Sequence, residues 1–129
     1  MSNPTDAYGN AANMAPIDPR ENEATLLIKA ASQLQRVREH WVEEQSELID
    51  ALTYNRKIWT VFAASAAEIQ HPLPLEIKQN IANLALFIFK RTTEIEAVPA
   101  PEKLDSLINI NRQIAAGLFQ KPVETAPAP

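Results

Sequence analysis

The chain has 129 residues, 46% of them hydrophobic, and a formal net charge of −4 at pH 7. This length suits one domain with its own core, and two glycines are fewer than a β-rich fold spends on turns, so composition favours an all-α fold. The absence of cysteine excludes disulfides, thiolate metal sites and cysteine nucleophiles. The acidic balance, with scattered Lys and Arg, argues against direct nucleic-acid binding.

Both ends of the chain differ in composition from its middle. Residues 1–17 mix Asn, Ala, Pro, Gly and Ser without apolar periodicity, so we expect a flexible tail with Tyr8 as its one candidate anchor. Residues 18–120 form the predicted helical domain, and residues 121–129 a disordered Pro/Ala tail. No signal-peptide pattern is present, and the most apolar run, residues 81–89, is far shorter than the roughly 20 residues that span a bilayer. We therefore expect a cytoplasmic protein without membrane insertion.

The first predicted helix begins at Pro19, because Asp18 can cap it and proline suits the first helical position. It runs to about Arg38 or His40. Its apolar stripe consists of Leu27, Ala31, Leu34 and Val37. Residues 39–46 contain neither Pro nor Gly, but their acidic run suits a new first helical turn, so we expect a break there. The alternative is one continuous helix over 19–69.

The second predicted helix runs from about Glu44 to Ile69 and ends before the prolines at 72 and 74. Steps of three and four residues place five side chains on one face: Leu48, Leu52, Asn55, Trp59 and Phe62. A carboxamide in such a stripe costs about 1–3 kcal/mol unless it is hydrogen-bonded. We therefore expect Asn55 to be buried and paired within the fold, or offered to a partner.

The third predicted helix opens with Pro74 at its first position and continues to about Glu96. Its stripe consists of Ile77, Ile81, Leu84, Ile88 and Ile95. Three further large apolar side chains, Leu86, Phe87 and Phe89, make its middle apolar around most of the circumference, which suits either a central buried helix or a partner surface. We expect one of these three to stand outside the core, or to pack under the N-terminal tail until a partner displaces it.

The fourth predicted helix spans about residues 102–119, with an inner face of Leu104, Leu107, Ile108, Asn111, Ile114, Ala115 and Leu118. Asn111-Arg112 repeats the pattern of Asn55-Arg56, an Asn within the stripe and an Arg just outside it. Two such Asn residues on packed helices can bond each other and fix the register of a bundle. Coincidence between two amphipathic helices explains the repetition equally well.

Few residues suit catalysis. His40 lies in a charged stretch and His71 in a proline turn, without carboxylates at metal-ligand spacing, so we interpret both as solvated surface histidines and expect no catalytic residue, metal or cofactor. An acidic band, Glu39, Glu43, Glu44, Glu47 and Asp50, is interpreted as a solvated face, with a docking surface for a basic partner as the alternative. Arg56 and Arg112 are expected to pair with carboxylates of the bundle rather than with RNA.

Five short motifs occur in order along the chain: Ala7-Tyr8, Arg20-Glu21-x-Glu23, Asn55-Arg56-x-x-Trp59, x-Pro72-Leu73-Pro74 and Leu107-Ile108-x-Ile110-Asn111-Arg112. Over about residues 7–118 they resemble the bacterial FlaF family of small flagellar biosynthesis regulators. The resemblance implies a regulator that promotes flagellin synthesis and export, associates with flagellin, and acts opposite FlbT, a translational repressor of flagellin messages.

Two hypotheses follow from the resemblance. In the first, the protein is a chaperone or adaptor that covers an amphipathic flagellin helix; in the second, it acts on flagellin messenger RNA through an FlbT-like partner. For the first, excess apolar surface predicts a site where the second and third helices meet the Pro72–Pro74 turn. The candidate contact residues are Tyr54, Asn55, Arg56, Trp59, Phe62, Leu73, Leu86, Phe87 and Phe89.

Overall fold

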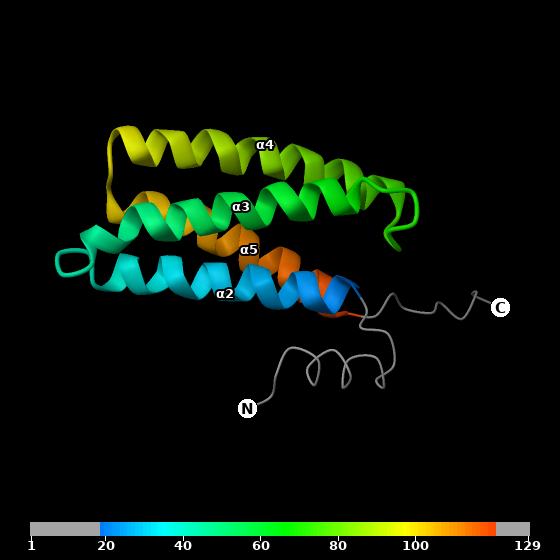
Figure 1. Cartoon of the computed structure of the whole chain (residues 1–129), viewed down its shortest axis with the longest axis horizontal. Coiled ribbons are helices and arrows are strands. Elements are labelled where there is room, and N and C mark those ends of the chain that lie inside the picture. The colour runs from blue at the N-terminus through cyan, green and yellow to red at the C-terminus, as the bar shows by residue number, and fades with distance from the viewer. Residues whose placement is uncertain (1–18, 121–129) are drawn as a thin grey trace, which may run out of the picture.

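Residues 19–120 are described by a computed structural model, in which four α-helices follow one another along the chain (Figure 1). The α-helices are α2 (Pro19–Glu39), α3 (Leu48–Ala66), α4 (Leu75–Ala97) and α5 (Leu104–Phe119), and the single-turn 3-10 helices η1 (Gln45–Glu47) and η2 (Pro101–Lys103) precede α3 and α5. The predicted all-α bundle of about four helices is therefore confirmed. The expectations for both tails, and for Asp18 as a helix cap, lie outside the described residues.

The predicted break between the first two helices is confirmed, and its position follows from backbone hydrogen bonds. After α2 ends, the amide of His40 still donates to Arg36, and the amide of Glu44 donates to His40 at 2.8 Å. Arg36 Nε also donates to both carboxylate oxygens of Glu44, at 3.1 and 3.3 Å. These contacts turn the chain without Pro or Gly, so α3 begins at Leu48 rather than at Glu44 as predicted.

The segment between α3 and α4 differs in detail from the prediction. Helix α3 ends at Ala66, several residues before the prolines, because the chain enters turns in which the amide of His71 donates to the carbonyl of Glu68. Pro74 has φ −59° and ψ 151°, which makes it the cap before α4 rather than the predicted first helical residue. An extended ψ at this position lets the following turn start cleanly at Leu75.

The core lies between the helices, where α2 packs extensively against α5 and also against α3, and α4 adds its buried stripe from the other side of α3. The predicted apolar stripes supply its fully buried side chains, among them Leu27, Leu34, Leu52, Trp59, Ile88, Ile95, Leu104 and Leu107. Helix α4 packs mainly on α3 and is an outer helix of the bundle (Figure 1). Of the two alternatives left open for this helix, the central buried helix is therefore excluded. Ile77, predicted to be in its buried stripe, is 40% exposed because it lies in the open first turn.

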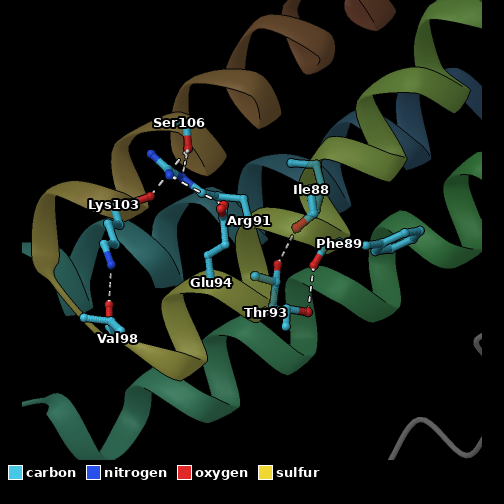
Figure 2. A network of polar contacts seen from close by, with 9 residues as sticks. Ile88, Phe89, Arg91, Thr93, Glu94, Val98, Lys103 and Ser106 are labelled. Carbon is cyan, nitrogen blue, oxygen red and sulfur yellow. Dashed lines mark hydrogen bonds and ion pairs between the residues drawn. The ribbon is translucent and has the colours of Figure 1, made fainter.

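Helix α4 is joined to α5 by polar contacts around the intervening turn (Figure 2). Arg91 Nε donates to Ser106 Oγ at 3.2 Å and Arg91 also pairs with Glu94, while Lys103 Nζ donates to the carbonyl of Val98 at 2.6 Å. The Thr93 hydroxyl donates back to its own helix. These contacts hold the C-terminal end of α4 against the start of α5, and they leave the rest of α4 resting on α3.

Candidate functional site

A buried polar cluster connects three helices at the centre of the molecule. Trp59 Nε1 on α3 donates to Asn111 Oδ1 on α5 at 2.8 Å. Asn111 Nδ2 in turn donates to Asn55 Oδ1 at 2.7 Å and to the carbonyl of Leu27 on α2 at 3.2 Å. We name Asn55, Trp59 and Asn111 the polar core cluster. The expected burial of Asn55 and its pairing with Asn111 are both confirmed.

The chemistry of the polar core cluster fixes its orientation. An indole N–H can only donate, so Trp59 requires the oxygen of Asn111 to face it, and the amide nitrogen of Asn111 must then find acceptors elsewhere. Asn55 supplies one such acceptor, although its own Nδ2 has no hydrogen-bond partner among the described residues. The cluster therefore sets how α5 is seated on α2 and α3, which is a structural role.

His71 is buried, so its interpretation as a solvated surface histidine is wrong. Its Nε2 lies 2.8 Å from Glu23 Oε1 on α2, and both side chains are almost fully shielded from solvent. The turn after α3 folds back onto the first turns of α2, with Leu73 packed against the core beside it. Sequence spacing gives no sign of this contact because Glu23 and His71 are 48 positions apart. His40 is exposed, as expected.

The candidate contact residues on α3 do not form one surface. Asn55, Trp59 and Phe62 lie in the core, with Trp59 and Phe62 packed edge to face at 5.4 Å between ring centroids. Tyr54 lies toward α2, where the ammonium of Lys29 stands 5.7 Å from its ring centroid. These side chains support the bundle, and only Tyr54 retains partial exposure.

Arg56 lies on the other side of α3 and pairs with Glu96 of α4 at 2.8 Å, which confirms the expected pairing with a carboxylate of the bundle. Arg112 is exposed and pairs with no carboxylate in the part of the chain that the structure describes. Leu73 and Phe89 are half-buried and pack against the core. Three of the candidate contact residues, Arg56, Leu73 and Phe89, are thus already engaged in contacts within the bundle.

Leu86 and Phe87 of α4 are the candidate residues that remain open to solvent, with 68% and 43% of their surfaces exposed. The buried stripe of α4 uses Ile81, Ala85, Ile88, Thr92 and Ile95, so these two side chains stand on opposite flanks outside it. One of Leu86, Phe87 and Phe89 is expected outside the core, and the structure places two of them there, Leu86 and Phe87. Phe89, between the stripe and Leu86, is the one that packs inward.

The flank of α4 that carries Phe87 is turned toward α5 at the C-terminal end of α4. The hydrogen bond between Arg91 and Ser106 marks the sides by which α4 and α5 face each other. Steps of three and four residues from Arg91 lead to Phe87 and Leu84, and steps of four from Ser106 lead to Ile110 and Ile114. We name these four apolar side chains, Leu84, Phe87, Ile110 and Ile114, the α4–α5 seam. Apart from Phe87 they are half-buried.

Sequence reasoning missed the α5 half of this seam. Ile114 was assigned to the inner face of the fourth helix, and Ile110 was not singled out except within a motif. The sequence does contain a signal for them, because Ile110 and Ile114 lie beside the buried stripe of α5 on the same flank as Ser106. The apolar side chains there exceed what one core face requires. Which neighbour lies on that flank depends on the packing order of the helices.

One surface ion pair, between Arg38 and Asp105, shifts the pKa values of both its partners. Arg38 Nε donates to Asp105 Oδ1 at 2.9 Å and Arg38 Nη2 to Oδ2 at 3.3 Å, across the junction of α2 and α5. The hydrogen bond from the guanidinium holds the pKa of Asp105 below its ordinary value, and the carboxylate raises the pKa of Arg38. Within residues 19–120, His, Asp and Glu side chains do not gather in threes that could hold a metal ion.

Comparison with known proteins gives one match. The model of a family described as flagellar protein FlaF matches residues 4–118, a range that includes α2, α3, α4 and all of α5 except its last residue, Phe119. Neither curated proteins nor solved structures match the chain. In the described part of the chain, no helix combines the length and the apolar character needed to cross a membrane.

Proposed function

Because the chain belongs to the FlaF family of flagellar proteins, we propose that it is a non-enzymatic adaptor that binds flagellin and thereby promotes its synthesis and secretion. The adaptor acts in the cytoplasm before flagellin assembles. Its partner contact is an amphipathic helix of flagellin, whose apolar side needs cover until it packs in the filament.

The exposure of Leu86 and Phe87 in the middle of α4 is the observation that supports this proposal most. Large apolar side chains outside the core are a common feature of protein interaction surfaces. On this helix they are accompanied by the α4–α5 seam, so a partner helix lying along α4 meets apolar side chains from two elements. The same helix rests on α3, and its side-chain polar contacts with other segments lie near its two ends, at Lys78 and from Arg91 to Glu96. The middle of α4, which carries Leu86 and Phe87, offers its outer side to a partner.

The contacts expected in the complex are those of a helix laid in a groove. Phe87 and the seam receive the apolar stripe of the flagellin helix, and Leu86 covers its edge. Burial of an aromatic ring of this size contributes on the order of 2 kcal/mol. Such a contact depends weakly on salt, unlike the contacts of a protein that neutralises RNA phosphates.

A titration of purified flagellin against single-residue variants tests the proposal. Leu86→Ser and Phe87→Ser should each weaken flagellin binding at least about tenfold, equivalent to 1.4 kcal/mol, while the thermal midpoint stays nearly unchanged. Ile28→Ser is the matched control, because Ile28 is 38% exposed and lies on α2, which does not pack against α4. Unchanged affinity in both α4 variants, or an equal loss in the control, contradicts the proposed site.

A further inference from the structure

A second apolar surface lies on the other side of the bundle, between α2 and α3. A groove of about 360 Å³ runs from the first two turns of α2 along the second half of α3. Its apolar walls are Pro19, Leu26, Ile58, Val61 and Phe62, with Lys57 on the rim. Val61 is 64% exposed, and Leu26 and Ile58 are half-buried. Val61 therefore stands largely in solvent, and Leu26 and Ile58 are open on the side of the groove.

The chain itself arrives at this groove. Pro19 is both the first described residue and a wall of the groove, so the segment that precedes it in the chain is attached at this edge. The residues directly before α2 include two large apolar side chains, Met14 and Ile17. An apolar residue preceding a helix cap often packs on the fourth helical residue, but that position holds the polar Asn22, itself part of the groove lining.

The two prolines of this segment restrict the backbone conformations that it can adopt. The residues before Pro16 and Pro19, namely Ala15 and Asp18, are biased to extended or polyproline conformations. In a polyproline helix, with three residues per turn, Met14 and Ile17 share one side. That side can therefore meet Leu26, Ile58 and Val61 together.

The extent of the family match favours the same segment. The match begins at residue 4 and ends at residue 118, so it includes residues 4–18 before α2 and leaves out the last residues of the chain. The family pattern therefore covers the segment before α2, whereas at the other end it stops within α5. Attachment at Pro19 also gives the segment an effective concentration on the order of millimolar at the groove, so a weak contact is sufficient.

We propose that residues 14–17 fold back over the start of α2 and occupy the α2–α3 groove, with Met14 and Ile17 against Val61 and its neighbours. The segment is then a covering ligand in cis, separate from the partner surface on α4. This departs from the flexible tail expected for residues 1–17, because composition alone gives no information about an open groove next to Pro19.

Disulfide trapping in the full chain tests this docking, since the native sequence has no cysteine. The pair Ala15→Cys with Val61→Cys should cross-link at least tenfold faster than the pair Ala15→Cys with Thr60→Cys. Thr60 is exposed at the same height of α3 but points to the side away from the groove, so both pairs are equally accessible to an undocked tail. Equal rates overturn the proposal.

The other possible occupants give different results in the same assay. Disulfide-linked dimers of the single variant Val61→Cys, with equal rates for the two pairs, would assign the groove to a second copy and overturn the proposal. Equal rates for the two pairs, combined with protection of the Val61→Cys thiol by added flagellin, would assign the groove to flagellin. That result would also overturn the proposal.

Hydrogen exchange gives a readout that does not depend on cysteines. In the native chain the amides of residues 14, 15 and 17 should exchange at least tenfold more slowly than in Ile17→Asp, which changes only the tail and leaves the helices intact. Identical exchange in the two proteins overturns the docking.

Discussion

The carboxamide of Asn111 contacts α2 and α3 at once, through the carbonyl of Leu27 and through the side chains of Asn55 and Trp59. Each of these groups is buried, and an unpaired buried polar group costs about 1–3 kcal/mol. Removal of Asn111 leaves the Trp59 Nε1 and Asn55 Oδ1 atoms unpaired, while the carbonyl of Leu27 keeps its hydrogen bond within α2. Removal of Asn55 leaves only the Nδ2 of Asn111 with one acceptor fewer. The two residues are therefore unequal although their sequence surroundings are alike.

Asn111→Leu should lower the free energy of unfolding by about 3 kcal/mol or more, because two buried side-chain groups, Trp59 Nε1 and Asn55 Oδ1, lose their hydrogen bonds together. Asn55→Leu should cost about 1–2 kcal/mol, since Asn111 Nδ2 keeps the carbonyl of Leu27. It should also preserve folding while loosening helix register, seen as a changed elution volume. Urea denaturation measures both, with Asn109→Leu, an exposed neighbour on α5, as the control within about 0.5 kcal/mol. Equal losses for the three variants would show that the cluster does not set the stability.

At the scale of elements, the position of α4 decides which of its apolar side chains stabilise the fold. Its inner stripe rests on α3, and Phe89 adds a half-buried ring on that side. Leu86 lies only three residues before Phe89 in the helix, but its side chain is exposed to solvent. Stability and partner binding are therefore expected to depend on different residues of one short stretch.

Phe89→Ser should lower the free energy of unfolding by about 2 kcal/mol, because it removes a large ring packed against the core. Leu86→Ser should lower it by less than about 1 kcal/mol, mostly through the weaker helix propensity of Ser. Chemical denaturation of both variants measures the difference. Large losses in both would mean that the outer side of α4 is core, and the partner surface would have to lie elsewhere.

The junction of α2 and α5 is the element contact that should respond to acid. The pKa of Asp105 is lowered in the folded state by its hydrogen bond with Arg38. Its stabilising effect is therefore fully present above the ordinary Asp value of about 3.9 and is lost as the pH falls through the lowered folded pKa.

Asp105→Asn should accordingly lower the thermal midpoint slightly at pH 7, and the difference from the native chain should vanish in strong acid. The effect is small because both side chains are well exposed to solvent. Glu76→Gln is the control, an exposed first-turn carboxylate on α4 that shares the helix-dipole contribution but has no arginine partner among the described residues. A midpoint difference that persists unchanged at pH 2 would exclude the ion pair as its cause.

The helices themselves follow from periodicity, and their arrangement does not. Leu27, Leu52, Ile88 and Leu107 are buried because steps of three and four residues define one face of each helix. Periodicity gives no order of neighbours, which is why α4 could be read as central when it is an outer helix. His71 was missed for a related reason, since burial of a turn residue depends on where the turn folds back.

For the whole molecule, the family motifs and the proposed partner surface are largely different residues. Glu23 and His71 form one buried polar contact. Asn55, Trp59 and Asn111 form the polar core cluster. Four of the five motifs that resemble the FlaF family therefore contribute to holding the bundle together. Asn55 and Trp59, both placed in the candidate site from the sequence, are buried by the structure.

The part of the candidate site that sequence could identify is the excess of apolar residues on α4. Leu86 and Phe87 stand out because one core stripe cannot use them. Their continuation onto Ile110 and Ile114 requires the three-dimensional pairing of Arg91 with Ser106. Apolar surface from two helices favours a protein partner over an RNA, whose phosphates need a basic surface.

Binding of purified flagellin to the native chain at low and high salt tests this account most directly. We predict a direct complex whose Kd changes less than about threefold between 50 and 500 mM salt, because the contact is apolar. The flagellin message leader and an FlbT-like protein, titrated separately under the same conditions, provide the comparison. The account is contradicted if flagellin does not bind while the message leader binds with an affinity that falls steeply with salt.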